Sequence, residues 1–196
     1  GRSGKDSTRG DKMKDRQLTA NFRLKEFSKK DLTPYQECHV EMLAKKLQYL
    51  RDILNLGYAK NGKMVSIQIT SGVRTMEDYQ RLLAKGYHPS KTSDHFCGVQ
   101  IDGKPTLGAA DIRVKNCSLT LRQVFEKLVE LDINGGLTFG QIIYEKNPAT
   151  GAEWIHLGNS WNEIFASETV RECINKTRKK YLISLDNGVT FKEFGK

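Results

Sequence analysis

The chain has 196 residues, enough for one domain with a sizeable core, and 38% of them are hydrophobic and 28% charged. No apolar run reaches the roughly 18 residues of a membrane span, and no signal peptide is visible because the charged N-terminus has no apolar stretch behind it. The net charge of +9 favours anionic polymers as partners, namely nucleic acid, acidic membranes or anionic cell wall. Part of this charge lies in residues 1–16 and 175–180, where solvated flexible charges explain it equally well.

The four cysteines, Cys38, Cys97, Cys117 and Cys173, are widely spaced. None forms a Cys-x-x-Cys pair, which argues against a four-cysteine zinc site. We interpret them as reduced thiols of a chain that folds in a cytoplasm.

The N-terminal region, residues 1–17, has no apolar periodicity and is predicted to be disordered. Ordered structure is expected to begin at residue 18, where Phe22, Leu24 and Phe27 can contact a core. This region is therefore predicted to be a basic tail that precedes the folded domain.

The first clear helix covers residues 33–57. Thr33 is a favourable N-cap, Pro34 suits the first helical position and Gln36 completes a capping box, while Gly57 is placed to end the helix. His39, near the start of this helix, is predicted to be a surface histidine.

The remaining elements alternate between the three-to-four-residue apolar spacing of helices and the two-residue alternation of strands. A strand is predicted within residues 64–75, a helix at 75–86, a strand at 109–114, a helix at 119–131, an antiparallel hairpin at 138–158, a basic helix at 167–180 and a second hairpin at 181–194. This order indicates an α+β fold with a mainly antiparallel sheet flanked by helices in one domain. The candidate metal ligands described below would place a zinc site at this sheet. Residues 18–165 form its body and 166–196 a C-terminal extension.

Two of the four histidines are candidates for a metal site. A catalytic zinc ion usually takes three protein ligands from His, Asp, Glu or Cys and leaves one position open. His88 lies in a loop and is predicted to be a surface residue, like the helical histidine, which leaves His95 and His156. Asp102 and Asp111 both lie between these two histidines in the sequence, and either can supply the third ligand.

Glu153 lies three residues before His156 on a predicted strand. A carboxylate beside a metal site can take a proton from water and pass it to a leaving group. Residues three apart on a regular strand point to opposite faces, so joint action requires Glu153 to lie at an irregular start of the strand, just after the turn at Gly151.

The motifs in order resemble the zinc D-Ala-D-Ala carboxypeptidase family. The matching features are Ser-x-His-x-x-Gly at residues 93–98, a run of small residues that ends in Asp-Ile at 111–112, and Glu-x-x-His at 153–156. The family includes D-Ala-D-Ala dipeptidases and phage L-alanyl-D-glutamate endolysins. "SGVRT" resembles its Ser-Gly-aromatic-Arg segment, and "NFRLKEF" and "FGQIIYE" resemble the phage-type branch. The resemblance covers residues 21–161.

This resemblance implies a Zn²⁺ ion and a role for each matching side chain. Glu153 would be the general base, and Arg74 would stabilise the substrate oxyanion. The implied zinc ligands are His95, one aspartate and His156, and the implied shaping residues are Ser93 and Gly98.

The aspartate is where the chain departs from the family pattern. The family spacing of seven residues after the histidine would select Asp102, whereas the small residues and the following isoleucine match Asp111. We predict Asp111, because a ligand on a strand is held rigidly. Residues 99–107 would then be an insertion beside the metal.

The implied activity is hydrolysis of peptidoglycan stem peptides by a phage or prophage enzyme. Such a protein would be made in the cytoplasm and act at the bacterial cell wall, with an anionic wall polymer as a further candidate partner. The D-Ala-D-Ala, L-Ala-D-Glu and cross-bridge bonds all remain open as targets. The alternative is a non-catalytic structural or wall-binding virion module on the same fold. Nucleic-acid binding has no motif to support it.

Overall fold

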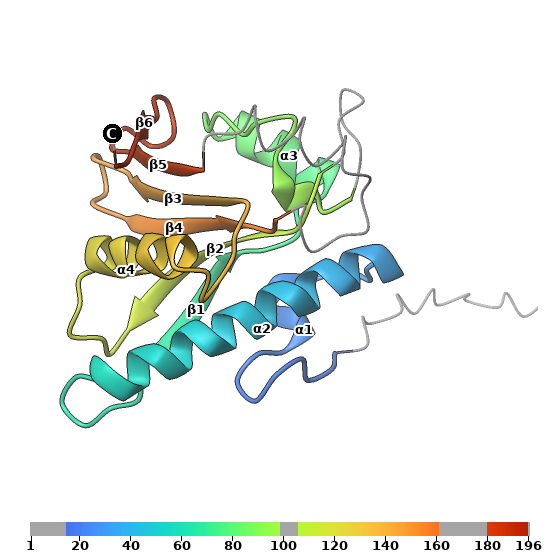
Figure 1. The fold of residues 1–196 in the computed structure, drawn as a ribbon. Helices are drawn as coiled ribbons and strands as arrows, with labels where there is room; N and C mark the ends of the chain where they lie inside the picture. The colour runs from blue at the N-terminus through green and yellow to red at the C-terminus, as the bar shows by residue number, and fades with distance from the viewer. Residues whose placement is uncertain (1–14, 99–105, 161–179, 196) are drawn as a thin grey trace, which may run out of the picture.

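A six-stranded sheet with the strand order β1-β2-β4-β3-β5-β6 organises the protein (Figure 1). The computed structural model describes residues 15–98, 106–160 and 180–195. The strands are β1 (Ser66–Ser71), β2 (Ala109–Lys115), β3 (Gln141–Lys146), β4 (Glu153–Gly158), β5 (Tyr181–Ser184) and β6 (Lys192–Glu193). All neighbours are antiparallel except β3 and β5, which are parallel. The predicted single-domain α+β fold with a mainly antiparallel sheet is confirmed.

The helices begin where local capping predicts. They are α1 (Leu24–Phe27), α2 (Pro34–Gly57), α3 (Met76–Ala84) and α4 (Leu121–Ile133). A threonine caps each of α2, α3 and α4 and forms a capping box with the residue three positions on, in the pairs Thr33–Gln36, Thr75–Asp78 and Thr120–Gln123. A cap of this kind stabilises a helix by about 1 kcal/mol. The short α1 was not predicted.

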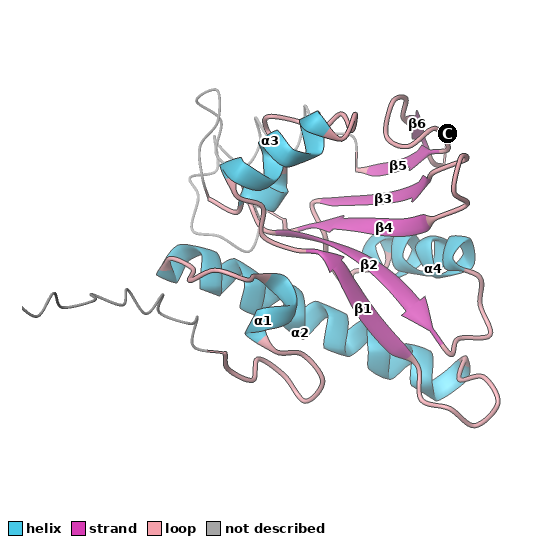
Figure 2. Cartoon of the chain, turned by 180° about the vertical axis from the view of Figure 1, so that it is seen from behind, coloured by secondary structure: helices cyan, strands magenta, loops and turns pink. Residues whose placement is uncertain are grey.

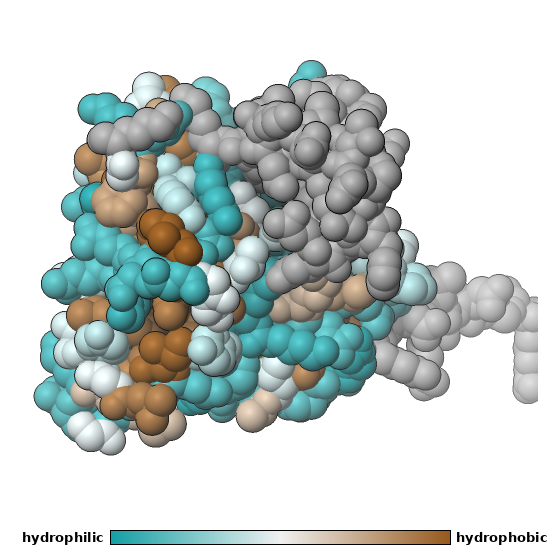
Figure 3. All heavy atoms as spheres, viewed as in Figure 1, coloured by the Kyte–Doolittle hydropathy of each residue, from teal (hydrophilic) through white to brown (hydrophobic). Residues whose placement is uncertain are grey.

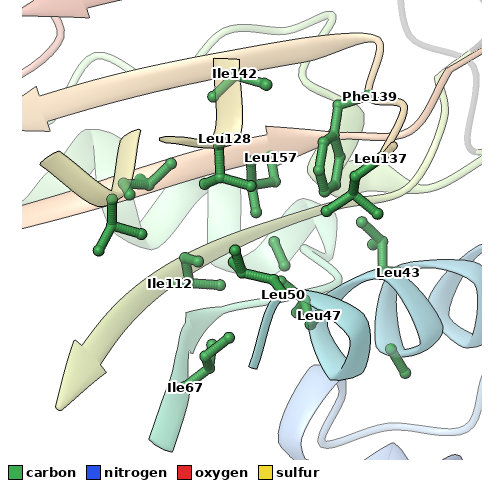
Figure 4. Close-up of a cluster of buried hydrophobic side chains, with 14 of the residues drawn as sticks. Leu43, Leu47, Leu50, Ile67, Ile112, Leu128, Leu137, Phe139, Ile142 and Leu157 are labelled. Carbon is green, nitrogen blue, oxygen red and sulfur yellow. The ribbon is translucent and has the colours of Figure 1, made fainter. Parts of the chain in front are cut away.

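Helices α2 and α4 cover one face of the sheet and leave the other face open (Figures 1 and 2). The covered face supplies alternate strand residues to a core in which Leu47 of α2, Leu128 of α4 and Ile112 of β2 meet, each with no exposed surface (Figure 4). Along the same strands, the residues in between point to the open face because side chains alternate. In Figure 2 the open face is turned toward the viewer, with α3 at one end of the strands.

The predicted C-terminal hairpin is confirmed. Strand β5 pairs with β3 and β6 pairs with β5, so residues 181–193 extend the main sheet. The predicted basic helix at 167–180 falls almost entirely outside the described residues. Ordered structure begins earlier in the chain than predicted. Asp15 accepts a hydrogen bond from Arg23, and Gln17 forms a β-bridge with Arg23.

His39 is buried, so the prediction that it lies on the surface is wrong. Only 2% of its surface is exposed. Its ring packs on Tyr35, with centroids 4.5 Å apart, and the side-chain amide of Asn159 donates to its carbonyl oxygen. Asn159 directly follows β4 and brings the sheet against the first turns of α2, a contact that helix periodicity alone does not reveal.

The described surface seen in Figure 3 is mostly polar, with apolar side chains in small groups. None of the helices within the described ranges has the length and apolarity that crossing a membrane requires. The thiols of Cys38, Cys97 and Cys117 are free, and Cys173 lies outside the described residues.

Candidate metal centre

Three side chains from separate elements converge on the open face of the sheet. His95 lies in a 3-10 turn (Asp94–Phe96), and Asp111 of β2 lies directly opposite His156 of β4 in the antiparallel register. His95 Nε2 is 3.1 Å from Asp111 Oδ1 and 3.1 Å from His156 Nδ1, and the last two atoms are 2.9 Å apart. These three residues can hold a metal ion. Asp102 lies outside the described residues, so the structure locates only Asp111 beside the two histidines.

The spacing of the three ligand atoms fits a small divalent cation. In a tetrahedral zinc site with bonds of about 2.0–2.1 Å, neighbouring ligand atoms are about 3.3 Å apart. The observed separations of 2.9 to 3.1 Å are a few tenths of an ångström shorter. Two imidazole nitrogens and a carboxylate oxygen are also ligands that zinc accepts.

The protonation of His95 supports a cation at this point. Its Nδ1 is 2.8 Å from the carbonyl oxygen of Gly72, which can only accept, so Nδ1 carries the hydrogen. In the neutral ring, Nε2 then presents a lone pair 3.1 Å from the carboxylate of Asp111. Two acceptors at this distance repel each other unless a proton or a metal ion lies between them. A backbone carbonyl that fixes the tautomer of a histidine is a common feature around bound metals.

The pKa shifts of Asp111 and His156 favour the forms of these two residues that bind metals. Burial alone would raise the pKa of Asp111, but the charge of His95 and hydrogen bonds from His156 and His95 outweigh it and hold that pKa well below its ordinary value. Burial lowers the pKa of His156, despite the opposing effect of Asp111. An ionised carboxylate and a neutral imidazole are the forms that bind metals.

Ser93 and Gly98 frame the turn that carries His95. The Ser93 hydroxyl accepts from the backbone N–H of His95 and caps the turn. Gly98 has φ +86°, and a Cβ at this position would lie 2.3 Å from the ring of Tyr35. Its N–H donates to the carbonyl oxygen of Thr106 at 2.9 Å. Any larger residue at Gly98 would therefore be strained and would displace the ring.

Arg74 lies beside the metal centre and its guanidinium has no ion-pair partner among the described residues. Its backbone N–H donates to the carbonyl oxygen of His95 at 2.7 Å, and its Nη1 is 3.5 Å from Ser93 Oγ. Burial lowers the pKa of Arg74, while the charges of Asp111, Asp78 and Glu145 act against that shift. A partly buried guanidinium of this kind can bind an anionic group that enters from solvent.

Glu153 does not reach this site, and its predicted role as general base is corrected. It pairs with Lys146 in the regular β3–β4 register, so its side chain lies on the opposite face of β4 from His156. Its carboxylate forms an ion pair with the Lys146 ammonium at 3.6 Å. The irregular start of the strand that joint action requires is absent from β4.

Glu145 is the acid that sequence reasoning missed. It lies on β3 opposite Trp154, and its neighbour two residues back, Ile143, lies opposite His156. Alternation therefore places Glu145 on the open face with the metal ligands, and it lines the same cleft. The signal was available in "QIIYEK", because pairing the two strands of the hairpin puts every second residue on the face of His156.

The surroundings of Glu145 favour its protonated form. Burial raises its pKa to about 7, and the negative charge of Asp111 contributes to this rise. A hydrogen bond from the Trp154 side chain and the charges of His95 and Arg74 oppose it. A carboxyl group with a pKa near neutrality can both accept and return a proton at physiological pH.

This shift predicts a pH-dependent stability. Between 4.5, the ordinary pKa of a glutamate, and about 7, the folded protein keeps a proton on Glu145 that the unfolded chain has lost. Stability of the metal-free protein should therefore fall as pH rises through this window, by on the order of 3 kcal/mol. Glu145→Gln should remove this fall and Glu153→Gln should retain it, as measured by denaturant unfolding with chelator between pH 4 and 8. Equal slopes in both variants would contradict the assignment.

The cleft that contains these groups has a volume of about 1520 Å³. This exceeds the roughly 300–1,000 Å³ of a typical small-molecule pocket. Comparisons with family models, with curated proteins and with solved structures find no match. Interpretation of the site therefore rests on its geometry and on the motifs in the sequence.

Proposed function

We propose that the protein is a zinc-dependent peptidase that hydrolyses peptidoglycan stem peptides. The observation that carries this proposal is the convergence of His95, Asp111 and His156 beside Glu145 and Arg74 in one cleft. Metal-assisted peptide hydrolysis can use a metal-binding triad, a carboxyl group that titrates near neutrality and a guanidinium that has no ion-pair partner among the described residues.

The catalytic work divides among these residues by their chemistry. His95, Asp111 and His156 would hold a zinc ion, which would supply Lewis-acid polarisation of water and of the substrate carbonyl. Glu145 accepts the proton of the attacking water and donates it to the departing amine. Arg74 stabilises the negative charge that develops on the carbonyl oxygen.

The substrate class rests on the motif resemblance and is supported by two features of the cleft. Its volume suits an extended peptide of several residues, whereas a small metabolite would fill only part of it. The guanidinium of Arg74, which has no ion-pair partner in the described part of the chain, suits a substrate that carries carboxylates, as stem peptides do. The net charge of +9 favours approach to an anionic wall.

The test is release of new amino groups from purified sacculi. The zinc-loaded protein should release them, a chelator should stop the release and added zinc should restore it. Mass spectrometry of defined muropeptides then identifies the bond that is cut. A zinc-loaded protein that releases no amino groups but still sediments with sacculi would be a wall-binding module, and the peptidase proposal would fail.

A further inference from the structure

The turn of the C-terminal hairpin lies against the carboxylate of Glu145. A Cβ built on Gly188 would be 3.2 Å from Glu145 Oε2, a tight contact that would displace the carboxylate by a few tenths of an ångström. Leu182 of β5, together with Asn187, Gly188 and Phe191 of the turn, lines the same cleft as the metal ligands. The motifs that resemble known peptidases end at residue 161, so this hairpin is a feature of the chain that those motifs do not account for.

The turn is braced internally and anchored to the sheet. Asp186 accepts hydrogen bonds from the hydroxyl of Ser184 at 2.8 Å and from the N–H of Thr190 at 2.9 Å, and the N–H of Gly188 donates to Ser184 Oγ at 2.9 Å. A hydrogen bond from the Thr190 hydroxyl, together with those from the Thr190 N–H and the Ser184 hydroxyl, lowers the pKa of Asp186 to about 2. The N–H of Asn187 donates to the carbonyl oxygen of Lys146, at the end of β3, at 3.0 Å.

This anchoring fixes the turn relative to Glu145. Lys146 is the next residue after Glu145 on β3, and β5 runs parallel to β3 with Ser184 opposite Glu145. The turn that follows Ser184 lies against the Glu145 side chain at Gly188 before the chain returns in β6. The side chain of Trp154, on β4, donates a hydrogen bond to the same carboxylate.

We propose that the hairpin turn, residues 185–191, is a positioning element of the catalytic centre, which confines the Glu145 carboxylate between Gly188 and Trp154 and directs it into the cleft. This proposal rests on the proposed function only in naming Glu145 as the base. The charged groups that act on Glu145 from the other elements are Asp111, His95 and Arg74. Asp186 is held by bonds within the turn.

Gly188→Ala tests the contact, with Gly151→Ala as its matched control. Both glycines have positive φ, +79° and +70°, but nothing lies within 4 Å of a Cβ at Gly151. The strain of alanine is therefore similar at the two positions, and only Gly188→Ala should push against Glu145. We expect Gly188→Ala to lose roughly tenfold or more in kcat with unchanged zinc content, and Gly151→Ala to keep wild-type kcat. Equal kcat in the two variants would overturn the proposal.

Asp186→Ala provides a readout that does not require activity. Loss of the hydrogen bonds to Asp186 should loosen the turn and admit water to Glu145. The Glu145 carboxyl group should then titrate about one pH unit lower than in the wild type. NMR of the Glu145 side-chain carboxyl carbon in the full chain, assigned with Glu145→Gln, measures this shift. An unchanged titration would overturn the positioning role. If the wild type hydrolyses no peptide, the proposed function fails and this titration alone decides the inference.

Discussion

Glu145→Gln should abolish peptide hydrolysis while leaving zinc bound. Glutamine keeps the shape of the side chain and its hydrogen bond to Trp154, but it cannot accept a proton from water. Loss of a general base costs roughly 10²- to 10⁴-fold in rate. The measurement is kcat on a defined muropeptide, together with zinc content by elemental analysis.

Glu153→Gln is the matched control, because it changes the same residue type on the neighbouring strand. Its side chain lies on the opposite face of the sheet, paired with Lys146. Its kcat should stay within about twofold of the wild type, as expected for loss of an exposed ion pair. The reverse pattern, with activity lost only in Glu153→Gln, would restore the assignment that the motif favours and contradict the one made from the structure.

Asp111→Asn should lower zinc affinity by more than about 100-fold, because the amide lacks the charge of the carboxylate that binds the metal. The Asp111 carboxylate contacts both histidine ligand atoms, at 3.1 and 2.9 Å. Competition with a chromogenic chelator measures the affinity. Asp102→Asn should bind zinc like the wild type, and loss of zinc in that variant alone would show that the family spacing of seven residues identifies the ligand.

Much of the fold could be predicted because its signals are local. The capping boxes at Thr33 and Thr120 set the starts of α2 and α4, and the turn residues fix both hairpins. The burial of His39 could not be predicted, because its partner Asn159 lies 120 residues away. A side chain near a helix start can face solvent or a neighbouring element, and only the tertiary arrangement decides between them.

The candidate metal-binding triad was predictable for a similar reason, whereas the carboxyl group of Glu145 beside it was missed, although the register of the predicted hairpin could have indicated it. Asp111 lies within strand β2, whose sequence has clear strand character, so its position could be inferred from local context. The motif predicted a general base at Glu153, three residues before His156. Because side chains alternate along a strand, Glu153 points to the face of the sheet opposite to His156. Identifying Glu145 requires the pairing of β3 with β4, which brings Trp154 beside it, and the hairpin turn that covers it.

The central claim is that two imidazoles and one carboxylate share a single divalent ion. Zinc K-edge X-ray absorption on the stoichiometrically loaded protein tests it most directly, because the spectrum reports the type and number of ligand atoms. We predict one zinc per chain with nitrogen and oxygen neighbours at about 2.0–2.1 Å, the multiple-scattering pattern of two histidines and no sulfur. A spectrum with sulfur neighbours, or a protein that binds no zinc stoichiometrically, would contradict this account.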